Sequence, residues 1–119
     1  MSKILVVDDA AFMRMMIKDT LGKLGYSDVE EAADGAIAVE KFQQLNPDLV
    51  MLDVTMPNLD GIGALKAIKE LKPDAKVVMC SAMGQESMVV EAIKLGALDF
   101  IVKPFKPERI EKTMKVVLG

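Results

Sequence analysis

The chain has no histidine, no tryptophan and a single cysteine, Cys80, among its 119 residues. Without histidine, a cysteine nucleophile lacks its usual activating base, so covalent thiol catalysis is disfavoured. Cys80 has no partner for a disulfide and lies inside an apolar run, which is typical of a small buried residue in a reducing compartment.

Long apolar runs and basic clusters are missing as well. No stretch approaches the roughly 18 apolar residues of a membrane-spanning helix, and the N-terminus has no cleavage signature. The net charge is -3, the sequence pI is near 5.0, and the lysines are scattered along the chain. We therefore expect a cytoplasmic monomer with no membrane partner and no nucleic-acid partner.

Four short apolar runs are continuous enough to form strands that are buried on both faces of a parallel sheet. They are residues 4–7, 49–52, 77–80 and 100–102. A weaker fifth run, residues 28–32, alternates in polarity and suits an edge strand. A chain of 119 residues corresponds to one domain, which buries about two-thirds of the surface of the unfolded chain.

Five helical patterns alternate with these runs, and glycine or proline residues mark where several of them end. Their apolar faces are Met13, Met16, Ile17, Leu21 and Leu24; Ala38, Val39, Phe42 and Leu45; Leu65, Ile68 and Leu71; the segment 85–95; and Ile110, Met114 and Val117. Strand and helix alternate five times with short connections. Right-handed crossovers then predict an open, doubly wound α/β sheet in a single domain.

Polar side chains follow each of the four buried runs. Asp8 and Asp9 follow the first run, Asp53 the second, Ser81 the third and Lys103 the fourth. Ligands of open α/β sheets bind beyond the carboxyl ends of the strands, so these side chains should meet at one mouth. Taken singly, Asp9 and Ser81 suit helix caps and Asp53 suits a turn. That all four strands end in polar side chains of complementary charge favours a binding site over four independent caps and turns.

Three carboxylates at one mouth need more positive charge than one lysine supplies. Two carboxylates about 4 Å apart repel by about 4 kcal/mol at an effective dielectric constant of about 20. The available ligands are oxygens, with neither histidine nor thiolate among them, so a divalent cation here should be hard. A few carboxylates and several retained waters describe Mg²⁺ better than Ca²⁺ or Zn²⁺.

A metal ion, an ammonium group and a hydroxyl around a carboxylate are the groups that neutralise a phosphoryl group during its transfer. The nucleotide-binding patterns GxxxxGK[ST] and GxGxxG are absent, so the site suits a phosphoryl group but not ATP. Asp53 is the best-placed acceptor because it stands alone at its strand end, whereas Asp8 and Asp9 are adjacent. A carboxylate nucleophile would give an acyl phosphate.

Four motifs stand at the ends of the strands: VVDD at 6–9, DVTMPNLDG at 53–61 (the D-x-x-M-P-x-x-x-G pattern), SA at 81–82 and KPF at 103–105. Together they resemble the receiver domains of two-component response regulators. More narrowly, DDAAFMRMM at 8–16 and SAMG at 81–84 resemble the chemotaxis response regulators. The resemblance covers the whole chain and implies a flavodoxin-like (βα)5 fold with strand order 2-1-3-4-5. It also implies a receiver domain over residues 1–119 without an output domain, and no enzymatic activity beyond its own phosphorylation and dephosphorylation.

The resemblance assigns roles to the acidic residues at the mouth. Asp53 would accept a phosphoryl group from a phosphohistidine of a sensor histidine kinase. Asp9, Asp53 and the backbone carbonyl of Thr55 would hold Mg²⁺, and Asp8 would help through water.

The resemblance also implies how the signal is made. Lys103 would pair with the phosphoryl oxygens, Ser81 would move to hydrogen-bond them, and Phe100 would then turn inward. The Lys103–Pro104 peptide would be cis. Many receivers have threonine in place of Ser81 and many chemotaxis regulators have tyrosine in place of Phe100, so a hydroxyl at the second position is absent here.

The helical segment 85–95 indicates where a partner binds. Its apolar residues spread over an arc of roughly 220°, far more than the roughly 100° that a one-sided surface helix needs. Part of this helix should therefore be apolar and exposed, with Val89 and Ile93 beside Phe100. We expect this face to bind a flagellar motor switch protein once Asp53 is phosphorylated. The alternative is a phosphorelay intermediate that passes its phosphoryl group to a histidine phosphotransfer protein.

A second apolar pair lies on the helix that follows the first run. When its core face points inward, Phe12 lies on the flank and Met15 on the opposite side. Single exposed hydrophobic residues are common in soluble proteins. The functional interpretation is a docking site for a phosphatase or a kinase domain beside the acidic mouth.

Two functions from other classes fit less well. A phosphatase of the haloacid dehalogenase type needs a second aspartate two residues after the nucleophile, where this chain has Thr55. A flavin carrier of the same fold needs a hydroxyl and a glycine loop after the first strand. The sequence DDAAF at 8–12 would repel a phosphate there.

Overall fold

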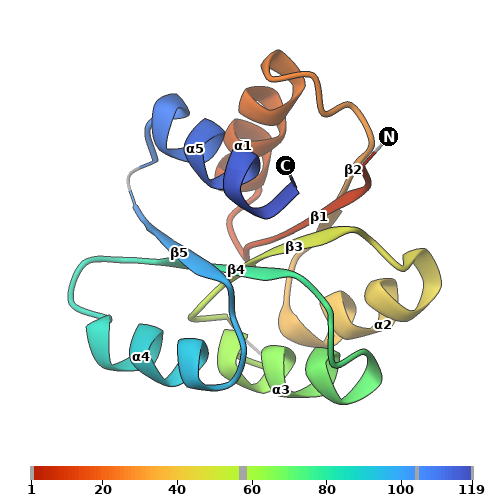
Figure 1. Ribbon diagram of the computed structural model, residues 1–119, viewed down its shortest axis with the longest axis vertical. Helices are drawn as coiled ribbons and strands as arrows, with labels where there is room; N and C mark the ends of the chain where they lie inside the picture. The colour runs from red at the N-terminus through yellow and green to blue at the C-terminus, as the bar shows by residue number, and fades with distance from the viewer. Residues whose placement is uncertain (1, 57–58, 104, 119) are drawn as a thin grey trace.

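The computed structural model describes residues 2–56, 59–103 and 105–118, in which five strands alternate with five helices (Figure 1). The strands are β1 (Ile4–Val7), β2 (Val29–Ala32), β3 (Leu49–Asp53), β4 (Val77–Ser81) and β5 (Asp99–Val102). The helices are α1 (Ala11–Lys23), α2 (Gly35–Leu45), α3 (Gly61–Leu71), α4 (Glu86–Lys94) and α5 (Pro107–Leu118). Within the described residues, no helix is long and apolar enough to cross a membrane.

The strands form one parallel sheet in the order β2-β1-β3-β4-β5, which confirms the predicted order. The central strands β1, β3 and β4 are buried along their whole length because both of their faces are covered by helices. β2 is an edge strand, as its alternating sequence indicated. Asp53 lies opposite Cys80, and Ser81 lies opposite Val102, so these strand ends are level.

Helices cover both faces of the sheet: α1 and α5 lie on one face, and α2, α3 and α4 lie on the other (Figure 1). Each face has its own hydrophobic core, to which alternate strand residues contribute. In β1, for example, Ile4 and Val6 join the core under α1 and α5, whereas Leu5 and Val7 join the other core. This two-sided covering leaves the carboxyl edge of the sheet as the place where polar side chains from several strands meet.

One run that was predicted to be buried on both faces is partly exposed. In β5, Ile101 is buried, but Phe100 is 37% exposed and Val102 is 41% exposed. A short apolar run looks the same in sequence whether its second face meets a helix or lines a groove. In this fold the two exposed side chains line a groove beside α4.

Two predicted helix faces extend too far. Met16 is 38% exposed because the buried residues of α1 form a narrow stripe of Ile17 and Leu21. Leu71 is 48% exposed because it is the last residue of α3 and lies past the last buried position, Ile68. The predicted cis peptide at Pro104 lies outside the described residues.

Candidate functional site

The structure brings the predicted carboxylates and lysine together at the carboxyl edge of the sheet. Carboxylate oxygens of Asp8, Asp9 and Asp53 all lie within 4.8 Å of one another. Lys103 Nζ lies 2.8 Å from Asp8 Oδ2 and 3.4 Å from Asp53 Oδ2. Side chains that follow or end β1, β3 and β5 therefore form one charged cluster.

Asp8 and Asp9 lie in the turn between β1 and α1. Asp8 is 1% exposed; its Oδ1 accepts a hydrogen bond from the Ala10 amide at 2.9 Å, and its Oδ2 accepts from Lys103. Asp9 is exposed and does not cap α1, because the N-cap is Ala10, which makes no side-chain cap bond. Helix capping therefore does not explain Asp9, which faces solvent at the mouth of the cluster.

Ser81 ends β4 and is buried. It does not cap α4 either, because the N-cap of that helix is Gln85. The carbonyl oxygen of Ser81 accepts a hydrogen bond from the Lys103 amide at 2.7 Å, and Ser81 also lines the groove beside α4. Ser81 thus contacts both Lys103, which directly follows β5, and the groove.

Burial and the charge of the partner shift the pKa values of Asp53 and Lys103 in opposite directions. Burial raises the pKa of Asp53, Lys103 lowers it and the charge of Asp8 raises it again, so the net shift is upward. Burial alone would lower the pKa of Lys103. The hydrogen bond to Asp8 and the charge of Asp53 outweigh burial and raise this pKa. The ammonium form of Lys103 is therefore favoured, but it faces more negative charge than it can neutralise.

The donor set fits a hard divalent cation. Three carboxylates share one ammonium group at short range, so the cluster carries excess negative charge. The neighbouring thiol is disfavoured as a soft ligand, because Cys80 is buried and burial raises its pKa to about 12. Asp8, Asp9 and Asp53, together with the Thr55 carbonyl that the resemblance implies, would offer Mg²⁺ oxygen ligands only.

Arg14 also shapes the site, although the sequence analysis did not single it out. Its Nη1 donates to the backbone carbonyl of Asp8 at 2.6 Å, and its Nε donates to Glu31 Oε1 at 3.1 Å. These bonds fasten the Asp8–Asp9 turn to the end of β2. A signal was present, since Arg14 is the only charged residue in the stretch AAFMRMM at 10–16.

Gly61 holds the loop after Asp53 close to its own strand. Its amide donates to the Val54 carbonyl at 2.8 Å, and a Cβ on Gly61 would lie 2.1 Å from the Asp53 carbonyl oxygen. No side chain fits at that distance. The glycine of the D-x-x-M-P-x-x-x-G pattern is therefore required by the close approach of two backbone segments.

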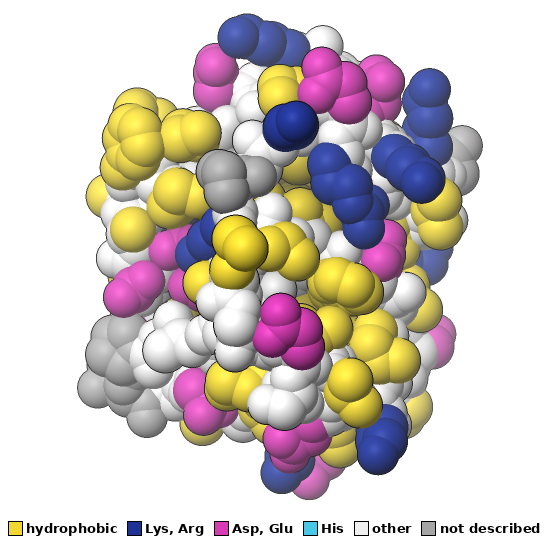
Figure 2. Space-filling view, turned by 90° about the vertical axis from the view of Figure 1, so that its left-hand side faces the viewer, with side chains coloured by type: hydrophobic (Ala, Val, Ile, Leu, Met, Phe, Trp, Pro, Cys, Tyr) yellow, Lys and Arg dark blue, Asp and Glu magenta, His cyan; other side chains and the backbone are white. Residues whose placement is uncertain are grey.

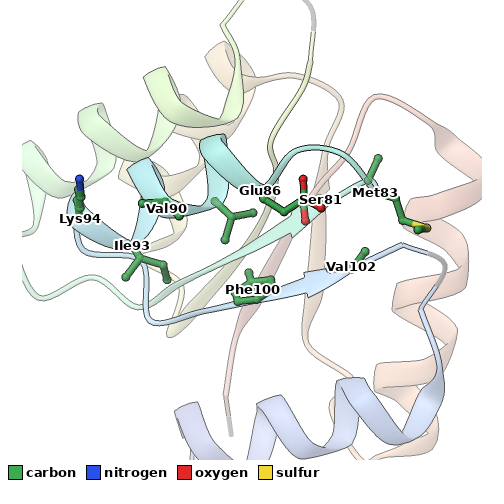
Figure 3. A pocket seen from close by; sticks show the side chains of 10 residues that line it. Ser81, Met83, Glu86, Val90, Ile93, Lys94, Phe100 and Val102 are labelled. Carbon is green, nitrogen blue, oxygen red and sulfur yellow. The ribbon is translucent and has the colours of Figure 1, made fainter.

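A groove of about 630 Å³ lies between α4 and β5 (Figure 3). Its walls are mostly apolar, and hydrophobic side chains gather across this face of the molecule (Figure 2). The labelled side chains that line it are Ser81, Met83, Glu86, Val90, Ile93, Lys94, Phe100 and Val102. The groove therefore begins at the strand end that carries Ser81 and is open to a partner.

The expected partner face is present with one correction. Ile93 is 43% exposed and lines the groove with Phe100, as the sequence analysis expected. Val89 also lines the groove but is only 7% exposed, so it forms part of the core and not an exposed contact. The apolar arc of α4 predicted an exposed side but not which of its residues turns inward.

Phe12 and Met15 are exposed on α1, at 64% and 59% respectively. Met15 lines a shallow surface depression with Lys18, Asp19 and Lys23. The expected exposure is confirmed, and docking at these two residues stays a prediction.

Comparison with known proteins identifies the family. Residues 4–115 match the response regulator receiver domain. The chemotaxis protein CheY of Bacillus subtilis is 58% identical over 117 residues, 98% of each chain, and that of Thermotoga maritima is 55% identical over 115 residues, 97% of this chain and 96% of that protein. The receiver domain of NtrX from Brucella abortus, a crystal structure, is 36% identical with a TM-score of 0.92 and 98% of each chain covered. The chain belongs to the response regulator receiver domain family.

Proposed function

We propose that this chain is a chemotaxis response regulator that accepts a phosphoryl group on Asp53 from a phosphohistidine of a sensor histidine kinase in a Mg²⁺-dependent reaction. The observation that carries the proposal is the cluster of Asp8, Asp9 and Asp53 around Lys103 at the carboxyl edge of the sheet. Membership of the receiver family and the two CheY relatives support the same class of reaction.

The proposed transfer is a single displacement at phosphorus. A carboxylate oxygen of Asp53 attacks phosphorus, the phosphorus–nitrogen bond breaks, and the imidazole leaves with the bonding pair, so Asp53 becomes an acyl phosphate. Lys103 Nζ, 3.4 Å from Asp53 Oδ2, is placed to pair with a phosphoryl oxygen. Asp9, Asp53 and the Thr55 carbonyl, with Asp8 acting through water, would hold a Mg²⁺ ion that would neutralise charge on the phosphoryl group. Ser81 would supply a hydroxyl after a local movement.

The acceptor is tested with Mg²⁺ and a small acyl phosphate as phosphoryl donor, followed by intact mass. We expect the wild type to gain the mass of one phosphoryl group and Asp53→Asn to gain none, because an amide is not a nucleophile here. Omission of Mg²⁺ should also prevent labelling. Equal labelling of Asp53→Asn would show that another residue accepts the group.

We further propose that the groove between α4 and β5 binds a flagellar motor switch protein when Asp53 is phosphorylated. The groove is apolar, open and begins at Ser81, so a movement of Ser81 would change its shape. Only a surface that differs between the two states can transmit the signal. Transfer of the phosphoryl group to a histidine phosphotransfer protein without motor binding would favour the phosphorelay alternative.

Ile93→Asp is expected to abolish motor switch binding and to leave phosphorylation of Asp53 unchanged. The substitution places a charge in an apolar groove, and a bound partner would bury that charge at a cost in binding free energy. Phosphorylation should be unaffected because the phosphoryl site lies at the end of β3 and not in the groove. Binding is measured by pull-down of the phosphorylated protein. Val116→Asp is the matched control because Val116 is 73% exposed on α5 and does not line the groove. Undiminished binding by Ile93→Asp would place the output elsewhere.

We propose that Phe12 and Met15 form a docking site for a kinase domain or a dedicated phosphatase. Both are exposed on α1, the helix that starts at the Asp8–Asp9 turn. The double variant Phe12→Ser, Met15→Ser should slow transfer from the kinase, or dephosphorylation by the phosphatase, while labelling by the small donor is retained. Leu71→Ser, which changes an exposed hydrophobic residue on α3, is the control. Unchanged rates with both proteins would remove the docking role.

A further inference from the structure

One glutamine side chain joins the two loops that carry the reacting and responding residues. The Gln85 carboxamide oxygen accepts a hydrogen bond from the Ala82 amide at 2.7 Å, and its nitrogen donates to Thr55 Oγ1 at 2.7 Å. Thr55 lies two residues after Asp53, and Ala82 directly follows Ser81. We call this pair of hydrogen bonds the Gln85 bridge.

The hydrogen bonds of the Gln85 bridge are not helix-capping bonds of α4. Gln85 is the N-cap residue of α4 but makes no side-chain cap hydrogen bond. An N-cap side chain ordinarily accepts from an amide in the first turn, and glutamine is not among the residues that do this well. The side chain instead folds back over Gly84, which has φ +90 and provides the tight turn that brings Gln85 to Ala82.

The Gln85 bridge holds the segment that has to move. Ser81 and Ala82 both line the groove beside Phe100, so a displacement of this pair alters the groove. The Ala82 amide can donate only one strong hydrogen bond, and that bond goes to Gln85. A phosphoryl group on Asp53 that draws the Ser81 hydroxyl inward would pull Ala82 with it and compete with the Gln85 bridge.

We propose that Gln85 is a positioning residue that stabilises the unphosphorylated arrangement of the loop from Ser81 to Gln85. This inference rests on the proposed function, because it assumes that Ser81 moves toward a phosphoryl group on Asp53. On this proposal the Gln85 bridge forms in the resting arrangement and breaks in the phosphoryl-binding one, so its removal shifts the population toward the phosphoryl-binding arrangement. Two hydrogen bonds at a partly exposed position correspond to a shift of about three- to tenfold.

The test measures the affinity for beryllofluoride with Mg²⁺, a tetrahedral mimic of a phosphoryl group on a carboxylate. In a titration followed by the Ala82 amide signal in NMR spectra, Gln85→Met should bind the mimic about three- to tenfold more tightly than the wild type. Methionine keeps the length of glutamine and removes both hydrogen bonds. In the absence of the mimic, hydrogen exchange of the Ala82 amide should be faster in Gln85→Met.

Two further variants separate positioning from a general effect on the fold. Gln44→Met changes an exposed glutamine near the far end of α2 and should bind the mimic like the wild type. Thr55→Val should bind more tightly than Thr55→Ser, which keeps the hydroxyl, and should add nothing in a Gln85→Met background because both remove the same bridge. If the Gln85 bridge merely stabilised the fold, its removal would lower the melting temperature without tightening the binding of the mimic.

The outcomes distinguish this inference from the proposed function. If the wild type bound no mimic and Asp53 accepted no phosphoryl group, the proposed function would be wrong and the inference with it. If the wild type bound the mimic but Gln85→Met bound it equally or more weakly, only the role of Gln85 would be overturned. Weaker binding would mean that the Gln85 bridge belongs to the phosphorylated arrangement.

Discussion

Lys103→Met is expected to lower the free energy of unfolding by roughly 3 kcal/mol near neutral pH in the absence of Mg²⁺. Lys103 Nζ is the partner of two buried carboxylates, at 2.8 Å from Asp8 and 3.4 Å from Asp53. Removal of one partner from a buried ion pair leaves the other charge uncompensated, which costs more than the pair contributes. The side chain of Lys103 is 23% exposed, so water screens part of this loss.

The pH dependence of this loss has a defined sign. The pKa of Lys103 is raised, so its contribution in the wild type is present below the unfolded value of 10.5 and is lost as pH rises through the folded value. In the variant, Asp53 loses the neighbour that lowers its pKa, so its folded pKa rises further above the unfolded value of 3.8. Ionisation of such a group costs stability as pH rises. The deficit should therefore be smaller near pH 5 than near pH 7.

Urea denaturation with a chelator present measures the deficit, and Lys112→Met, an exposed lysine on α5, is the control. Added Mg²⁺ should restore part of the stability, because a ligand that binds only the folded state stabilises it. A deficit that is independent of both pH and Mg²⁺ would mean that Lys103 acts by packing and not by charge.

The architecture was predictable because each central strand is a short, continuous run of apolar residues. A continuous apolar run such as ILVV at 4–7 is typical of a strand covered on both faces, and the alternating run at 28–32 is typical of an edge strand. The burial of β5 was overestimated because Phe100 and Val102 are apolar side chains that line a groove and are not part of a core. An apolar strand residue in a sequence does not show whether its side chain is covered by a helix of the same chain or lines an open groove.

The charged cluster was equally predictable, since parallel strands place every residue after a strand at the same edge. The order of the strands then brings Asp8, Asp53 and Lys103 together. The contacts of Arg14 and Gln85 could not be predicted in this way. Arg14 binds a backbone carbonyl, and Gln85 reaches across 30 positions to Thr55, so neither contact leaves a pattern of spacing in the sequence.

Gly61 lies between these two cases. The motif at 53–61 marked it as part of a family pattern, but spacing alone gave no reason for a glycine there. The structure supplies the reason, because a Cβ at position 61 would lie 2.1 Å from the Asp53 carbonyl oxygen and 2.7 Å from the Val54 Cα. Both neighbours are backbone atoms, one at the end of β3 and one in the residue after it, so neither can turn away as a side chain would.

Gly61→Ala is therefore expected to lower the free energy of unfolding by roughly 3 kcal/mol and to reduce labelling of Asp53 by a small acyl phosphate. Relief of the overlap requires the start of α3 or the end of β3 to shift, and the second shift displaces the acceptor carboxylate. Gly22→Ala is the matched control, because nothing lies within 4 Å of a Cβ there and Gly22 is in the last turn of α1. That change should stabilise the fold by about 0.5–1 kcal/mol. If both alanines had the same small effect in urea denaturation, the close approach at Asp53 would not be what requires a glycine at position 61.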